Sequence, residues 1–236
     1  MKNQNNQAVL DVLYDKNHSC PVCDTHFTSK AIRSRKNTIV STDSDLYRHF
    51  TVVNPIIYDI IVCPHCGYAA LENSFLNLRP TQIEWLKKEI GAKYTPTLYP
   101  EILNENQAIN RYKLALLSAM VKKSRIGERA YLCLKIGWLY RDLEDKDNET
   151  LYLNHAKRDL IAAFNTEPFP IFELNEMTTM FIIAELSRRS GELEQALRWV
   201  GDLIIERALP VPLRQRVEDL RNTVRDEMKD TPALTS

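Results

Sequence analysis

The sequence contains little glycine and no long apolar segment. Only 6 of its 236 residues are glycine, which argues against a turn-rich all-β fold and favours helices. The most apolar run, residues 56–62, is interrupted by Asp59 and is too short to cross a bilayer. The first residues are polar and do not have the apolar centre of a signal peptide. We therefore expect a cytoplasmic protein.

The chain also lacks an excess of charge of either sign. Lysine and arginine together number 31, and so do aspartate and glutamate. A protein with this balance has no strong positive field, so binding to nucleic acid or to an anionic membrane would have to be local. Glycine-rich phosphate loops and Gly-x-Ser-x-Gly turns are absent from the sequence. We identify no catalytic residues and expect a non-enzymatic protein.

The chain does contain two Cys-Pro-x-Cys pairs, Cys20 with Cys23 and Cys63 with Cys66. In a reducing compartment, thiolates at this double spacing are typical of metal ligands rather than disulfides. Four thiolates suit tetrahedral Zn²⁺ and leave no position open for water, so we predict a closed structural zinc centre. Similar knuckles hold iron in rubredoxins, although Asp24 stands where such a site would have glycine. An iron redox centre is therefore the alternative.

Segments typical of strands lie between the two cysteine pairs. Residues 38–42 and 56–62 are rich in β-branched side chains, and the second segment leads directly into Cys63. The order is therefore knuckle, strand, loop, strand, knuckle. We assign residues 1–79 to a small zinc-ribbon-like β domain.

From Pro80 onward the apolar residues recur at helical spacing. A charged connection is expected at residues 144–149. We assign residues 80–230 to an all-α domain with a C-terminal capping helix, so the expected fold class is α+β. The expected helices cover residues 81–90, 108–126, 128–142, 151–165, 175–190, 192–208 and 213–228.

These helices contain a weak internal repeat. Ala156, Leu160 and Ala163 have the spacing found in the second helix of tetratricopeptide (TPR) repeats, and residues 196–208 repeat it. The chain thus resembles two to three degenerate TPR-like repeats, although residues 144–150 form an insertion. An ordinary antiparallel helical bundle is the alternative.

A TPR-like domain would bind an extended peptide in a groove. Aromatic anchors beside arginines would hold such a peptide and its carboxylates, and the protein would act as an interaction scaffold. Burial of Trp138 and Phe181 in the core would contradict this hypothesis. The groove would be lined by Tyr131, Leu134, Trp138, Arg141, Thr178, Phe181, Glu185 and Arg188.

Nucleic-acid binding is an alternative function for a zinc ribbon. A basic and aromatic loop at residues 30–50 could bind phosphates and stack on a base, although Asp43, Asp45 and Asp59 would balance its charge. The basic residues are Lys30, Arg33, Arg35, Lys36 and Arg48, with Tyr47, His49 and Phe50 nearby.

Three stretches together resemble a known family. They are the first knuckle at residues 20–23, the Asp-Ser-Asp-Leu loop at residues 43–46 and, most specifically, residues 54–70 with the second knuckle. Followed by a TPR-like tail, they resemble a bacterial family known only as a domain of unknown function (DUF 2225). The resemblance implies a cysteine metal site and a helical tail, and it implies no activity. It leaves the partner and the oligomeric state open.

Overall fold

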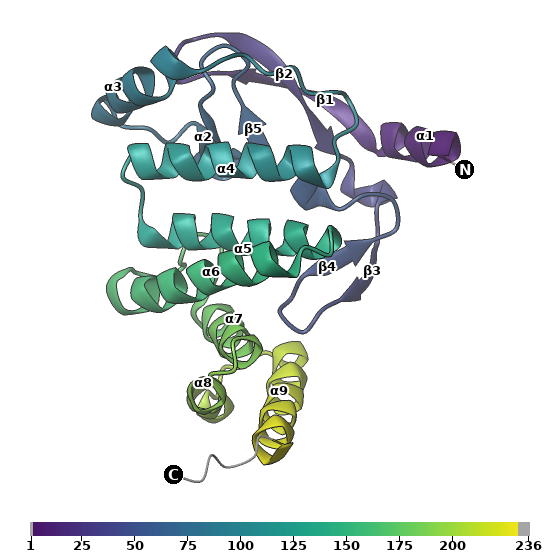
Figure 1. The fold of residues 1–236 in the computed structure, drawn as a ribbon, viewed down its shortest axis with the longest axis vertical. Helices are drawn as coiled ribbons and strands as arrows, with labels where there is room; N and C mark the ends of the chain where they lie inside the picture. Colours follow the sequence, from purple (N-terminus) through teal and green to yellow (C-terminus); the bar gives the residue numbers. More distant parts are fainter. Residues whose placement is uncertain (1, 231–236) are drawn as a thin grey trace.

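Three β-hairpins precede a stack of helices in the computed structural model, which describes residues 2–230 (Figure 1). Each hairpin is antiparallel. The predicted α+β class, with a zinc-ribbon-like β part followed by helices, is confirmed. After α1 (Lys2–Val12), the hairpins pair β1 (Leu13–Ser19) with β2 (His26–Ile32), β3 (Ile39–Thr42) with β4 (Arg48–Phe50), and β5 (Ile60–Val62) with β6 (Ala69–Leu71).

The strand expected at residues 56–62 is shorter than predicted, because its first half is a 3₁₀ turn, η2 (Pro55–Ile57). Pro55 fixes its own φ and has no N–H for a ladder. The side chain of Asn54 accepts a hydrogen bond from the Ile56 N–H at 3.3 Å and so caps the turn. Only the residues after Asp59 pair as a strand.

The helices follow the predicted order with two corrections. The helix expected at residues 108–126 runs instead from Glu105 to Val121. Residues 146–149, expected in a charged connection, belong to helix α6 (Lys146–Thr166). Asp145 caps that helix by accepting a hydrogen bond from the Asn148 N–H at 3.1 Å. The helices are α2 (Glu72–Phe75), α3 (Pro80–Glu89), α4 (Glu105–Val121), α5 (Ile126–Asp142), α6 (Lys146–Thr166), α7 (Glu176–Arg189), α8 (Leu193–Ile205) and α9 (Val211–Asp230).

From α4 onward, each helix packs against the next one in the chain. Small residues allow the close crossings: a Cβ atom at Gly137 of α5 would overlap the side chain of Leu153 on α6. Ala156 and Ala196 are fully buried at equivalent places in α6 and α8. Of the helices within residues 2–230, none is both long and apolar enough to span a bilayer.

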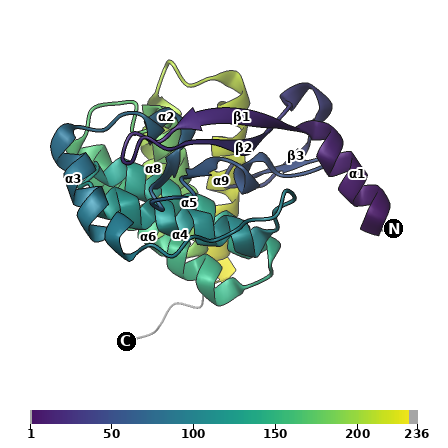
Figure 2. The ribbon, with the colours of Figure 1, turned by 90° about the horizontal axis from the view of Figure 1, so that it is seen from above.

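The hydrophobic core continues from the hairpins into the helices. Ile60 and Leu71 of the β5–β6 hairpin belong to the same buried cluster as Ile109 and Tyr112 of α4. The hydroxyl of Ser118 also accepts a hydrogen bond from the Ala69 N–H at 3.3 Å. The β5–β6 hairpin is therefore attached to α4, whereas α1 projects away from the body (Figure 2).

Candidate metal centre

The two knuckles bring four thiols together. Their Sγ atoms all lie within 4.8 Å of one another. Two distances between the knuckles are 3.6 Å, from Cys20 to Cys66 and from Cys23 to Cys63. Bonds of about 2.3 Å in a tetrahedral zinc–thiolate site place the sulfurs about 3.8 Å apart. The four cysteines are thus positioned to hold one metal ion.

Both knuckles make the same backbone turn. The Cys20 carbonyl accepts a hydrogen bond from the Asp24 N–H at 2.9 Å, and the Cys63 carbonyl accepts one from the Gly67 N–H at 3.0 Å. Asp24 and Gly67 have φ angles of +59° and +72°. Aspartate tolerates this left-handed conformation better than most residues. Asp24 therefore occupies the left-handed backbone position that Gly67 occupies in the second knuckle.

Mutual contact makes it unfavourable for Cys20, Cys63 and Cys66 all to ionise without a cation among them. Hydrogen bonding from Cys20, and to a smaller extent from Cys66, lowers the pKa of the Cys63 thiol to about 2. The pKa of Cys20 is raised to about 12, first by its contact with Cys63, and the pKa of Cys66 is raised as well. A divalent ion at the centre favours the thiolate form at all four positions. The donor set therefore fits a metal.

The centre is closed. Cys20 and Cys63 are fully buried, and Tyr68 and Phe75 pack beside them with ring centroids 5.0 Å apart. Tyr68 also donates a hydrogen bond to the Phe75 carbonyl at 3.0 Å. His65, which lies between two ligands, is exposed. Cys66 is buried as well, and Cys23 is half-buried.

The predicted peptide groove is covered by the chain itself. The exposed fractions of Trp138 and Phe181 are 6% and 2%, so the expectation of an open groove is wrong. The tip of the β3–β4 hairpin lies on this face (Figure 1). The ring of Tyr47 stacks on Trp138 at 5.2 Å, and the Trp138 indole donates to Asp45 at 2.9 Å.

The other groove residues are also engaged within the chain. Arg141 donates to Asp45 and Asp43, and Ser44 at the hairpin tip donates to Glu185 at 2.6 Å. Arg188 pairs with Glu185 at 2.8 Å. Tyr131 and Leu134 are buried, and Thr178 lies half-buried near the start of α7. An acidic segment complementary to these arginines was present in the sequence, but sequence spacing alone could not place it there.

Two of the loop residues expected to contact nucleic acid are engaged within the chain. Lys30 pairs with Asp15 at 3.0 Å and with Glu101 at 2.5 Å. Tyr47 is buried against the helices, so it is not available to stack on a base. The remaining cations, Arg33, Arg35, Lys36 and Arg48, are exposed.

The fold and the site define a protein in which zinc-ribbon-like cysteine knuckles are joined to an antiparallel helical stack. The family described as "Uncharacterized protein conserved in bacteria (DUF2225)" matches residues 13–229, and the chain belongs to it. A relative from Borreliella burgdorferi (strain B31), named "Uncharacterized protein", is 24% identical over 151 residues. That match covers 56% of this chain and 54% of the relative, so the chain spans about half of the relative's length. No solved structure matches the chain.

Proposed function

We propose that the protein is a non-enzymatic scaffold in which a single Zn²⁺ ion fixes two hairpins to a helical stack. The observation that carries this proposal is the closed set of four thiols within 4.8 Å of one another. With four protein ligands, the ion has no open position for a substrate or for water. Its contribution is then to folding, on the order of 10 kcal/mol.

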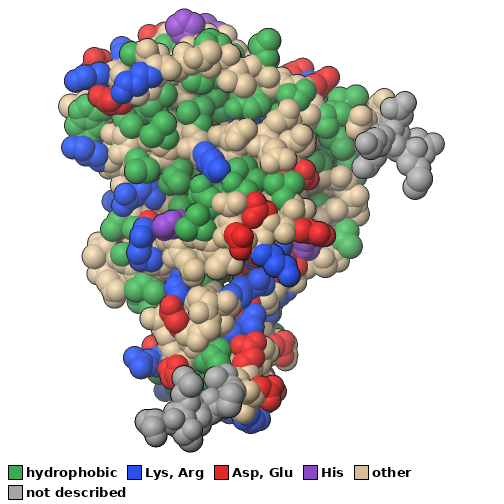
Figure 3. All heavy atoms as spheres, in the orientation of Figure 1, with side chains coloured by type: hydrophobic (Ala, Val, Ile, Leu, Met, Phe, Trp, Pro, Cys, Tyr) green, Lys and Arg blue, Asp and Glu red, His purple; other side chains and the backbone are tan. Residues whose placement is uncertain are grey.

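The surface that we propose for a protein partner lies on α4. Leu117 and Met120 are three residues apart on this helix and are 47% and 56% exposed, so they share one face. Trp85 of α3 extends this face, and the Lys123 ammonium lies 4.7 Å from its ring centroid. Hydrophobic side chains gather over the middle of this side of the molecule (Figure 3). A partner with an apolar face and an acidic rim would complement it.

Elemental analysis of the purified protein tests the metal. We expect one zinc per chain and no visible absorption, whereas a rubredoxin-like iron centre would be red. Cys63→Ser should lose the metal and unfold. Cys133→Ala is the matched control, because Cys133 is buried in α5 outside the centre, and it should keep the zinc. Equal zinc in both variants would contradict the proposal.

Cross-linking in cells with a probe at the α4 surface tests the scaffold function. Leu117→Asp with Met120→Asp should abolish any cross-linked partner. Leu98→Asp is the control, since Leu98 is 96% exposed on a different segment, and it should retain the partner. A partner that survives the α4 change would contradict this assignment.

The basic turn after β2 supports a second candidate function. Arg33 and Arg35 are exposed close together in the chain, and an ssDNA or RNA backbone could contact them. In a gel-shift assay, charge reversal at both should abolish binding that weakens with salt. The scaffold proposal expects no shift at any salt concentration.

A further inference from the structure

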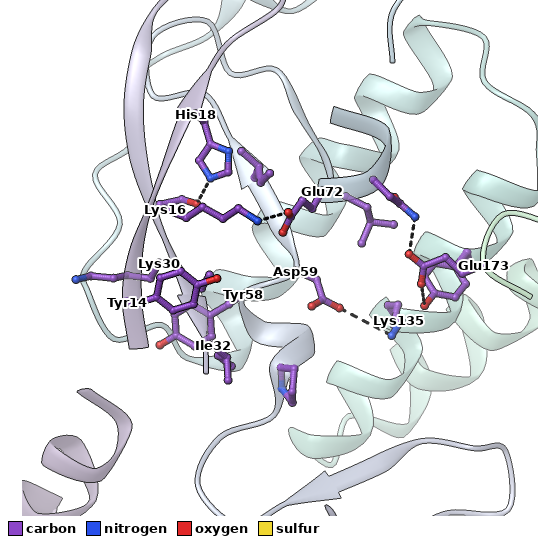
Figure 4. Close-up of a pocket in the computed structure, with 17 residues that line it drawn as sticks. Tyr14, Lys16, His18, Lys30, Ile32, Tyr58, Asp59, Glu72, Lys135 and Glu173 are labelled. Carbon is purple, nitrogen blue, oxygen red and sulfur yellow. Dashed lines mark hydrogen bonds and ion pairs between the residues drawn. The ribbon is translucent and has the colours of Figure 1, made fainter. Parts of the chain in front are cut away.

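A cavity of about 520 Å³ lies between the β1–β2 hairpin and α5 (Figure 4). Alternate residues of β1, namely Tyr14, Lys16 and His18, are half-buried and line it. Asp59 and Lys135 form another wall, where the carboxylate points toward the ammonium. The four cysteines do not line this cavity, so it is separate from the metal centre.

Most charged groups in the wall already have partners within the chain. Lys16 and Glu72 form an ion pair. Glu173 accepts hydrogen bonds from Asn73 and from the Tyr131 hydroxyl, each at 2.6 Å. Lys16, Glu72 and Glu173 therefore already have partners and do not require a charged ligand.

Asp59 and Lys135 are different, because they face each other without a direct hydrogen bond. The Lys135 Nζ atom lies 3.9 Å from the Asp59 carboxylate, and it has no hydrogen-bond acceptor among the described residues. The Lys135 ammonium instead lies 5.0 Å from the ring centroid of Tyr131. Asp59 accepts one long hydrogen bond, from the Tyr112 hydroxyl at 3.4 Å.

Lys135 is poorly solvated, whereas the Asp59 side chain is 34% exposed. Burial lowers the pKa of Lys135, and burial raises the pKa of Asp59. The side chain of Lys135 is only 12% exposed. Leaving the buried Lys135 ammonium without a hydrogen-bond acceptor is unfavourable, so a ligand that accepts from Lys135 and donates to Asp59 would be stabilised at this point of the wall.

The space between the Lys135 ammonium and the Asp59 carboxylate determines which chemical group can bind there. A hydroxyl can accept from the Lys135 ammonium and donate to the Asp59 carboxylate at once. An anion would be repelled by Asp59 and Glu173, and a cation would be repelled by Lys135. The neighbouring rings of Tyr14 and Tyr58 offer apolar surface to a carbon skeleton.

We propose that this cavity binds a small neutral polyhydroxylated molecule, a sugar or polyol, with one hydroxyl bridging Asp59 and Lys135. The volume lies within the range typical of small-molecule sites. The one sequence signal for it was Asp59, a carboxylate inside an otherwise apolar run of β-branched residues. The cavity is independent of the proposed scaffold surface on α4.

Saturation-transfer NMR on the full zinc-loaded chain tests the proposal, with ribose, glucose, glycerol and myo-inositol as probes at millimolar concentration. At least one probe should bind the wild-type protein. Lys135→Met and Asp59→Asn should each weaken its binding by about tenfold or more, because each removes a hydrogen bond to a charged group. Lys157→Met is the control, since Lys157 is a buried lysine that pairs with Glu192 outside the cavity.

Amide chemical shifts supply a readout that does not depend on a variant. In the wild-type protein, the bound probe should move the amide signals of Asp59 and Lys135 and leave that of Lys157 unchanged. Binding that is equal in the wild type and in both cavity variants would overturn the proposal. So would the absence of binding by all four probes, which would mean that water alone fills the gap.

Discussion

The contact between the β3–β4 hairpin and α5 should carry a large share of the stability. Asp45 is fully buried and accepts hydrogen bonds from Arg141 Nη1 at 3.0 Å and from Nη2 at 2.5 Å. Arg141→Met would leave this carboxylate buried with the Trp138 indole as its nearest donor. Removing one partner of a buried ion pair costs about 3–5 kcal/mol. Arg189, at 3.9 Å from Asp45, offsets part of this cost. We therefore expect Arg141→Met to lower the free energy of unfolding by about 3 kcal/mol.

Urea unfolding followed by circular dichroism measures this loss. Arg158→Met is the control, because Arg158 is 68% exposed in its ion pair with Asp159, and such a pair contributes about 0–1 kcal/mol. Asp45→Asn and the double variant complete a cycle that isolates the coupling between Asp45 and Arg141. A loss for Arg141→Met no larger than that for Arg158→Met would refute the reasoning.

The same contact predicts a dependence on pH. Burial alone would raise the pKa of Asp45, but hydrogen bonding and charge from Arg141 outweigh it and lower the pKa below its usual value. Burial alone would raise the pKa of Glu185 as well, but its hydrogen bonds, first of all the one with Arg188, outweigh burial and lower the pKa. A lowered pKa contributes stability that is present above about pH 4 and is lost as the pH falls through the folded-state pKa. Acid unfolding should therefore be less steep in Asp45→Asn than in the wild type.

Gly67→Ala and Tyr68→Phe, near the four cysteines, should both lower the free energy of unfolding in the same urea assay, whereas a control substitution in α8 should raise it. Gly67→Ala should lower the free energy of unfolding by about 1 kcal/mol or more, because Gly67 has φ +72° and a Cβ atom there would overlap the Tyr94 ring. Gly201→Ala in α8 meets no atom within 4 Å and should raise it by up to about 1 kcal/mol; equal effects at both positions would contradict the turn geometry. Tyr68→Phe removes the hydrogen bond to the Phe75 carbonyl and should cost about 1–2 kcal/mol without loss of the proposed metal, whereas loss of that metal would mean that the hydroxyl positions the ligands.

Local patterns predicted the elements that depend on neighbouring residues. The spacing of Cys63 and Cys66 located a knuckle, and apolar periodicity located most helices between residues 80 and 230. Errors arose where a single capping side chain determines the local backbone conformation. Asn54 caps a turn inside an apparent strand, and Asp145 starts a helix inside an apparent charged loop. Both are capping residues next to segments whose composition indicated something else.

A further error concerned long-range pairing. Sequence spacing located a helical face with Trp138, Arg141 and Arg188 that suits an extended acidic segment, and the structure shows that this segment is the chain's own residues 43–47. Arg141 is separated from Asp45 by 96 positions, so no local pattern could pair them.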